Sequence, residues 1–481
     1  MTLPGHSGPR HILGALTAML ALMVPLDTLC ADPLIRFPEV VDLVQIRPGD
    51  AEIETMPGKG ETLKIRPGPG RKFYERTIGG SPYREGKLDW DLLMRLIKDD
   101  KTPGPKILKL LPGVVVEFTP KSYKPIKSKN SLDAQTYRWS GLVTSNGKVV
   151  GEGLFIVDEK RHKMSATIDY NDKVYEIVPL KNGNLRIYEL TATRYPEEQY
   201  QSIYSIHPPD NPDRGGPPLR QSRSQALTRS DNQPCVIDVL VLYTQDAEDT
   251  WLNLGHADIW MEFDKATEIA NVAFANSDVH AEVQIVDRKR ITGDLFHESG
   301  FLADDLGKLQ DINNWEIARK VDKWRMEAGA DLVSLWVADG DWCGASPYFT
   351  NRGPKLNGEE GFSVVTVGCA AVIKSLAHEI GHNLGARHTR VDDHISASDI
   401  NNNFGHLSVN DAVRTIMALN TECRANSVYC RRTSQYSNPE IPYPGTDTMT
   451  GVSIDEGKAA DNHATLVTTT CEAASYRESR N

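Results

Sequence analysis

The chain has no cysteine between residues 31 and 234, although six of its seven cysteines follow that stretch. It also has no long apolar run after residue 30, so no membrane-spanning helix is predicted there. Positive charge is not in excess, because the formal net charge is −11 at pH 7. Nucleic acid and anionic membranes are therefore poor partners, since both would repel the chain. The apolar content of 40% is ordinary for a folded protein, and 481 residues suggest two or three domains.

The N-terminus has the composition of a targeting segment. Arg10 and His11 precede an almost wholly apolar run over residues 12–26, which ends in a stretch of small residues. This arrangement predicts a signal peptide over residues 1–31, removed near Cys30 or Ala31. A lipid anchor on Cys30 is the less favoured alternative. We therefore expect a secreted protein, extracellular or periplasmic.

Removal of Cys30 would leave six cysteines, all after residue 234. An even number in an exported chain predicts disulfide bonds, and six cysteines allow 15 ways of pairing.

Composition divides the rest of the chain into two domains. Within residues 137–190, apolar and polar residues alternate between the turn pairs Asn146-Gly147, Asn171-Asp172 and Asn182-Gly183. This pattern is typical of successive β-hairpins, so residues 32–204 are predicted to form a β-rich domain. Residues 205–234 are rich in Pro, Gly, Ser and Asn, which indicates a flexible linker that contains a proteolytic processing site.

The C-terminal segment 235–481 alternates between predicted strands and helices. We expect strands over 235–244, 281–286, 331–337 and 362–368, and helices over 258–276, 314–329, 371–385 and 459–477. This alternation predicts an α+β domain in which helices cover a mixed, twisted sheet.

The stretch HEIGHNLGARH over residues 378–388 is the strongest functional signal. His378 and His382 are four residues apart, so on a helix both imidazoles face the same side and can bind one zinc ion. Gly385 ends the helix and allows a bend that brings His388 in as the third ligand. Three imidazoles leave the fourth position of a single catalytic zinc ion open.

Such a zinc site activates water for attack on a carbonyl. Glu379, beside the first ligand, would accept the proton and pass it to the leaving amine as general base and then acid. The residues thus predict peptide-bond hydrolysis without a covalent intermediate. The alternative is a secreted, zinc-stabilised module that binds a protein partner and cleaves nothing.

The motif H-E-x-x-H-x-x-G-x-x-H resembles that of the metzincin zinc proteases, and the similarity extends over most of 235–481. Further stretches, "IDVLVLYT", "DWCGAS", "FSVVTVGC", "YSNPEI" and "ADNHATLV", are similar to those of bacterial reprolysin-like proteases, including the peptidyl-Asp metallopeptidases. The resemblance implies a metzincin-like domain over 235–481 that acts on proteins or peptides. We expect a monomer. It assigns Met417 to a methionine turn below the metal, and residues 32–204 to a propeptide that acts as inhibitor or folding aid.

The chain departs from the family pattern at two positions. Thr389 follows the third histidine, where reprolysin-like sequences have aspartate, and Leu419 replaces the tyrosine that ligates the metal in some relatives. The propeptide has no cysteine, so latency through a thiolate on zinc is excluded. A carboxylate could replace the thiolate, with Asp50 as a weak candidate.

Several other polar residues of this domain could bind a metal by residue type but are not predicted to do so. His394, His406 and His463 are expected at the surface or in packing, because the ligand set is complete. The spacing of Asp392, Asp393 and Asp399 matches no calcium-binding loop. A solvated acidic loop is therefore favoured, and structural calcium lacks support.

The resemblance also suggests where the substrate binds. A strand near residues 344–350 would pair with it, and the segment Tyr436 to Pro439 would wall a side-chain pocket. A peptidyl-Asp enzyme needs a cation in that pocket. Arg387, Arg431 and Arg432 are available, although surface positions are the favoured interpretation of all three.

For the disulfides we suggest three pairs. Cys343 with Cys369 would flank the strand region before the zinc helix, and Cys423 with Cys430 would close a small loop after the methionine turn. Cys235 with Cys471 follows by elimination.

Overall fold

The computed structural model describes residues 40–46, 53–56, 69–98, 104–126, 135–196, 233–347, 361–394, 401–454 and 458–477. Residues from Val40 onward group into one compact unit. The predicted signal peptide, Asp50, Asp399 and nearly all of the linker with its processing site lie outside the described residues. Within the described part of the chain, no helix is long and apolar enough to cross a membrane.

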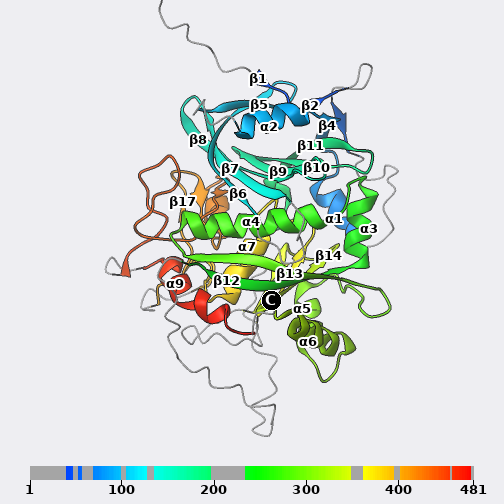
Figure 1. Ribbon diagram of the computed structural model, residues 1–481. Coiled ribbons are helices and arrows are strands. Elements are labelled where there is room, and N and C mark those ends of the chain that lie inside the picture. Colours follow the sequence, from blue (N-terminus) through cyan, green and yellow to red (C-terminus); the bar gives the residue numbers. More distant parts are fainter. Residues whose placement is uncertain are drawn as a thin grey trace, which may run out of the picture. The chain divides into compact units, whose positions relative to one another are not determined.

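The first part of the chain builds an eleven-stranded sheet, here the N-terminal sheet (Figure 1). Its strand order is β1-β5-β6-β7-β8-β9-β10-β11-β4-β2, and β3 pairs with β4. Neighbouring strands are antiparallel except for β1 and β5. The strands are β1 (Val40–Val41), β2 (Val44–Gln45), β3 (Glu54–Thr55), β4 (Pro82–Leu88), β5 (Lys106–Leu111), β6 (Val114–Pro125), β7 (Thr136–Ser145), β8 (Lys148–Asp158), β9 (Lys163–Tyr170), β10 (Lys173–Pro179) and β11 (Asn184–Thr191).

The predicted hairpin turns connect consecutive strands of this sheet. Asn146 (φ 51°) and Gly147 (φ 74°) join β7 to β8, Asn171 (φ 57°) joins β9 to β10, and Gly183 (φ 83°) joins β10 to β11. Asparagine and glycine tolerate these left-handed conformations at low cost, which explains why they mark the turns. The prediction of β-hairpins is therefore confirmed.

A second, five-stranded sheet follows, here the C-terminal sheet, with the order β13-β12-β14-β16-β15. All pairings are parallel except that of β15 with β16, and β15 forms an edge. Its strands are β12 (Cys235–Thr244), β13 (Ala281–Ile291), β14 (Leu332–Val337), β15 (Gly344–Ala345) and β16 (Phe362–Thr366). The four predicted strands are thus present, and this mixed sheet with its helices gives the expected α+β fold.

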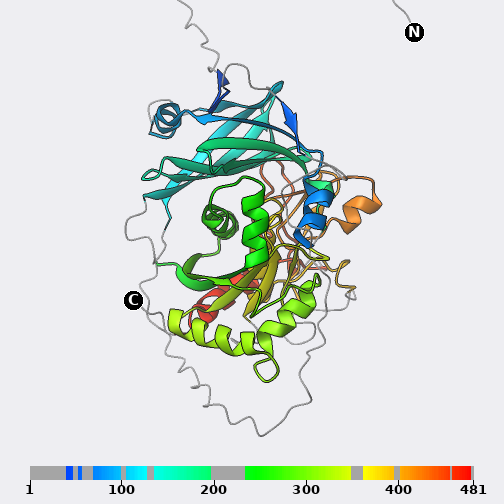
Figure 2. The same ribbon diagram turned by 90° about the vertical axis from the view of Figure 1, so that its right-hand side faces the viewer.

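Helices cover both faces of the C-terminal sheet. Figures 1 and 2 show α4 between the two sheets, and α5 and α6 on the opposite face of the C-terminal sheet. The helices are α1 (Pro69–Thr77), α2 (Trp90–Lys98), η1 (Ala192–Arg194), α3 (Gln245–Asn253), α4 (Trp260–Asn276), α5 (Leu302–Gln310), α6 (Glu316–Ala328), α7 (Ser375–Asn383), α8 (Thr421–Ala425) and α9 (Asn462–Ala473).

The helix predicted over 371–385 is shorter in the structure. Residues 371–373 form turns, and Lys374 takes a left-handed conformation with φ 65° directly before α7. A side chain rarely adopts this conformation inside a helix, so α7 begins only at Ser375.

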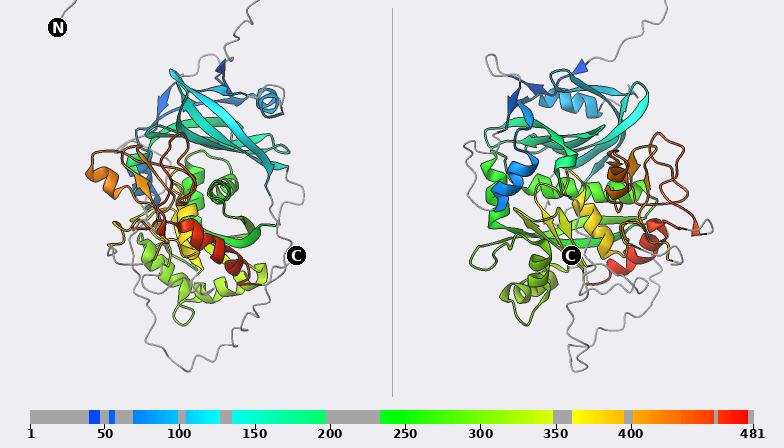
Figure 3. Two further views of the ribbon diagram at one scale, coloured as in Figure 1. Left: turned by 90° about the vertical axis from the view of Figure 1, so that its left-hand side faces the viewer. Right: turned by 180° about the vertical axis from the view of Figure 1, so that it is seen from behind.

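The C-terminal part also contains three disulfides and a small third sheet. Cys235 pairs with Cys471, Cys343 with Cys369 and Cys423 with Cys430, as suggested. A three-stranded sheet consists of β17 (Leu407–Ser408), β18 (Val413–Arg414) and β19 (Arg431–Arg432). Figure 3 shows α9 beside the end of α7, where the Thr469 hydroxyl donates to Leu384 O at 2.8 Å.

The two sheets share one hydrophobic core around α4. This core includes Leu154 and Ile156 of β8, Ala266 of α4, and Ile237 and Val239 of β12. Burial of such side chains stabilises a fold by about 1.5–3 kcal/mol each. The N-terminal sheet is therefore packed against the helical layer of the C-terminal part.

Charged groups are buried at the same contact. Lys265 of α4 is fully buried, donates to Glu176 of β10 and forms an ion pair at 2.8 Å with Glu262 of its own helix. Arg138 of β7 donates to Glu268 of α4 at 2.7 Å, and both side chains are buried. The contact thus combines apolar packing with buried ion pairs.

Candidate metal centre

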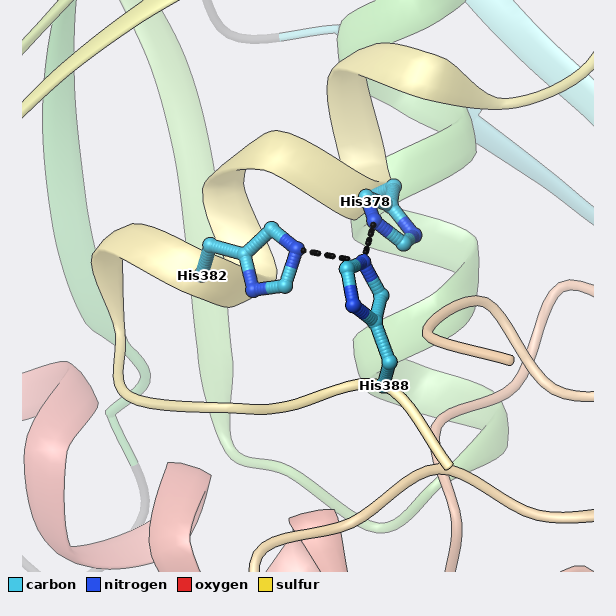
Figure 4. A group of neighbouring side chains, drawn as sticks. All are labelled: His378, His382 and His388. Atoms are coloured by element: carbon cyan, nitrogen blue, oxygen red, sulfur yellow. Dashed lines mark hydrogen bonds between the residues drawn. The ribbon is translucent and has the colours of Figure 1, made fainter. Parts of the chain in front are cut away.

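Three histidines converge at the end of α7 (Figure 4). His378 and His382 lie one turn apart on this helix, and His388 approaches from the segment that follows it. The Nε2 atom of His388 lies 3.1 Å from the Nε2 atoms of both His378 and His382. All three side chains are buried.

The other ring nitrogen of each histidine faces an oxygen atom. Nδ1 lies 2.9 Å from Ile416 O in His378, 2.9 Å from Ala386 O in His382, and 3.0 Å from Asp393 Oδ1 in His388. An Nδ1–H that donates to oxygen leaves the Nε2 lone pair available for a metal. Three nitrogens around a tetrahedral zinc ion are roughly 3.3 Å apart at Zn–N bonds of about 2.05 Å. The three histidines therefore fit a metal of this kind.

Two glycines make this geometry accessible. Gly385 has φ 90° and reverses the chain after α7, as predicted. A Cβ at Gly381 would lie 2.5 Å from Met417 Sδ and 3.0 Å from a ring carbon of Tyr436. Met417 and Tyr436 therefore pack directly against α7, and both are fully buried. Tyr436 also donates from its hydroxyl to Ala377 O at 2.8 Å, so its side chain supports the helix.

Asp392 and Asp393 do not form a solvated acidic loop, and that prediction was wrong. Both are buried, because each carboxylate has partners inside the protein. Asp393 accepts from Arg387 Nε at 3.0 Å with the oxygen that does not face His388. Asp392 accepts from the Thr389 hydroxyl at 2.8 Å and from Leu419 N at 3.3 Å. These contacts join the segment that carries His388 to the residues after Met417.

Asp393 is a residue that the sequence analysis missed as part of the site. A carboxylate that accepts from a ligating histidine fixes the ring and makes it a stronger donor to the metal. We expect Asp393→Asn to weaken zinc affinity by about 10- to 100-fold. Competition with a chelating dye measures this affinity.

The control is Asp411→Asn, a change at an exposed carboxylate, which should bind zinc as the wild type does. Equal zinc affinities of the two variants would show that Asp393 does not support the metal ligand His388.

Glu379 lies next to the first histidine and is buried. Its Oε2 accepts from the Ser346 hydroxyl at 2.6 Å. A Cβ at Gly344 would lie 2.3 Å from Glu379 Oε1, so a side chain at that position of β15 would displace the carboxylate. The carboxylate that follows the first histidine in sequence is therefore held against the end of the edge strand of the C-terminal sheet. Ser346 lies within the landmark "DWCGAS", although no role was predicted for it.

The remaining histidines lie outside the cluster, as expected. His394 is exposed. His406 lies 3.2 Å from the Tyr443 hydroxyl, and burial lowers its pKa to about 4. His463 lies 3.9 Å from Asp461 and is partly buried.

The favoured interpretation of the three arginines as surface residues was wrong. All three are buried. Arg387 pairs with Asp393 and stacks on Phe404, with 4.6 Å between its guanidinium carbon and the ring centroid. Arg432 donates to Ile373 O at 2.8 Å and to Ala418 O at 3.3 Å. Arg431 lies beside it in β19.

Comparisons with known proteins agree with this site. Residues 233–429 match the family model Reprolysin_5, described as metallo-peptidase family M12. The peptidyl-Asp metalloendopeptidase of Xanthomonas campestris pv. campestris is 28% identical over 316 residues, which are 65% of this chain and 67% of that protein. A protein of the same name from Stenotrophomonas maltophilia (strain R551-3) is 26% identical over 342 residues, which are 69% of this chain and 73% of that protein. Among solved structures, metalloproteinase-II from Bacteroides fragilis covers 80% of this chain at 11% identity, with a TM-score of only 0.35.

The matched segment is thus similar to reprolysin-like metallopeptidase domains, and it contains the three histidines and Glu379. This chain is a metalloendopeptidase. The predicted resemblance and the predicted class of enzyme are confirmed.

Proposed function

We propose that the chain is a secreted, zinc-dependent endopeptidase that is made as a precursor. The convergence of three imidazoles beside a buried glutamate is the observation that carries this proposal. Three nitrogen donors that face one point suit zinc. The two relatives are named peptidyl-Asp metalloendopeptidases, and we extend that preference to this chain, with cleavage beside an aspartate of the substrate.

In the proposed mechanism, His378, His382 and His388 hold the metal. Bound zinc would act as a Lewis acid toward the scissile carbonyl and lower the pKa of water to about 7. Glu379 accepts the proton of the attacking water and then delivers it to the leaving amine. Ser346 orients the carboxylate by donating to its Oε2 atom. The edge strand β15 pairs with the substrate backbone next to Glu379.

The experiment uses the secreted chain after cleavage within residues 205–232. We expect this form to hydrolyse casein, to lose activity with a chelator, and to recover when zinc is added. Cleavage that continues at full rate after complete removal of the metal would contradict the proposal. A protein that binds zinc stoichiometrically but cleaves no member of a broad peptide library would instead support the binding-module alternative.

The N-terminal sheet is proposed to act as the inhibitor or folding aid of the precursor. Its contact with the peptidase part contains Lys265, which forms ion pairs with two carboxylates, those of Glu176 and Glu262. Burial raises the pKa of Glu176 above its usual 4.5, Lys265 lowers it, and the nearby Glu262 raises it again. A single cation thus compensates only one of two buried negative charges.

This arrangement predicts how the contact responds to pH. A carboxyl whose pKa is higher in the docked state takes up a proton on docking, so the contact is strongest below about pH 4.5 and weakens as pH rises through the docked pKa. For the chain cleaved in the linker, we expect the N-terminal piece to bind several-fold more tightly at pH 5 than at pH 8, as measured by calorimetry. Glu176→Gln should reduce the difference, and tighter binding at pH 8 would contradict the assignment.

A further inference from the structure

Lys374 lies close to the metal centre but has no role in it so far. Its carbonyl oxygen accepts from His378 N at 3.1 Å, so it stands one helical turn before the first metal ligand, about 6 Å along the axis. The Arg432 guanidinium donates to the carbonyl groups of the preceding Ile373 and of Ala418. The start of α7 is thereby joined to the residue that follows Met417.

The ammonium group of Lys374 binds a carboxylate of the N-terminal sheet. Its Nζ donates to Asp169 Oδ2 of β9 at 2.6 Å, and both side chains are more than nine-tenths buried. Burial raises the pKa of Asp169, whereas the positive charges of Lys374 and, to a lesser extent, Arg431 lower it. Glu152 of β8 is the nearby negative charge.

Arg431 has unused hydrogen-bonding capacity at this place. Its side chain is buried, with 7% of its surface exposed, and its Nη1 atom has no hydrogen-bond partner among the described residues. Lys374, directly before α7, thus binds one aspartate of the N-terminal sheet, and Arg431 of β19 adds a second positive charge that acts on it. A cavity of about 180 Å³ adjoins them, lined among others by Lys374, Asp169, Glu152 and Ser434.

Two other cations near the metal centre are already engaged. Arg387 is paired with Asp393, and Arg432 is bound to backbone carbonyl groups. A substrate aspartate beside the scissile bond needs a cation within reach of the metal ligands. Lys374 meets this requirement by its position directly before α7, four residues ahead of His378. The carboxylate that it binds in the structure has the same chemistry as such a side chain.

We propose that Lys374, together with Arg431, forms the subsite for an aspartate side chain of the substrate, and that Asp169 occupies this subsite in the precursor. The inference rests on the proposed function and names the residues behind its substrate preference. Release of the N-terminal sheet removes Asp169 and exposes both cations to the substrate. Asp169 then acts as a substitute for the substrate side chain until the linker is cut.

The first test compares two peptides that differ only in Asp or Asn at the preferred position. In the processed chain we expect Lys374→Met to lower kcat/KM for the Asp peptide by about 10- to 100-fold, because a charge-assisted contact is lost. The Asn peptide should be cleaved within about twofold of the wild-type rate, with zinc content unchanged. Lys265→Met is the matched control, because Lys265 also binds a carboxylate of the N-terminal sheet, and it should keep the preference for Asp.

The second test leaves the sequence of the peptidase part unchanged. In the chain cleaved in the linker but not separated, Asp169→Asn should weaken inhibition by the N-terminal piece by about tenfold. Asp172→Asn, a change at an exposed turn residue of the same sheet, should not. If Lys374→Met fails to fold, this comparison decides alone.

Each outcome bears on a different claim. A folded Lys374→Met enzyme that still prefers Asp, or unchanged inhibition with Asp169→Asn, overturns the subsite. A wild-type enzyme that cleaves peptides without any acidic preference overturns it too and leaves the zinc endopeptidase intact. A wild type that cleaves no peptide refutes the proposed function, and the subsite with it.

Discussion

Glu379→Gln is expected to lower kcat/KM of the processed chain by a factor of about 10² to 10⁴, because the group that accepts and delivers the proton is lost. Zinc should remain bound, since all three histidines and their Nδ1 partners are unchanged. Peptide hydrolysis and metal content, measured on the same preparation, separate the loss of proton transfer from the loss of metal.

Glu472→Gln is the matched control for this experiment, because Glu472 is an exposed glutamate of α9. Its activity should equal that of the wild type. Full activity in Glu379→Gln would exclude the proposed proton transfer, whereas simultaneous loss of zinc would assign Glu379 a structural role.

Lys265→Met is expected to destabilise the full-length chain by about 3–5 kcal/mol at pH 7. The substitution leaves Glu176 and Glu262 buried without their cation, and an unpaired buried charge is costly. Denaturant unfolding followed by tryptophan fluorescence measures the loss. The structure thus predicts that one lysine dominates the electrostatics of the contact between the N-terminal sheet and α4.

Lys320→Met provides the comparison. Lys320 pairs with Glu316 at 3.1 Å on the exposed side of α6, where loss of an ion pair costs at most about 1 kcal/mol. The triple variant that adds Glu176→Gln and Glu262→Gln to Lys265→Met should recover much of the stability, because the uncompensated charges are gone. Equal stability of Lys265→Met and Lys320→Met would contradict the buried network.

Local signals in the sequence predicted the local structure well. The strand 235–244 coincides with β12, and the helix 258–276 differs from α4 by two residues at its start. The spacing of His378 and His382 defines their common face on any helix, and Gly385 supplies the positive φ that returns the chain to His388. These features depend on neighbours within about ten residues, so a pattern can reveal them.

Features that depend on distant partners were not predictable in this way. Asp393 resembles a loop residue until Arg387 and His388 fold around it. Lys265 lies on a helix where a charged side chain would normally face solvent, yet the N-terminal sheet supplies Glu176 from 89 residues away. The same holds for Lys374 and Asp169, which are 205 residues apart.

The three disulfides also determine what a single proteolytic cut can release. Cys235 and Cys471 join the first strand of the C-terminal sheet to its last helix across 236 residues. A cut between these two cysteines opens a loop but leaves both fragments covalently linked. After a cut before Cys235, no disulfide joins the two fragments, because residues 40–234 contain no cysteine. Under oxidising conditions, a single cut before Cys235 would therefore leave the N-terminal piece without a covalent link, whereas the fragments from a single cut between Cys235 and Cys471 would separate only after a reductant was added.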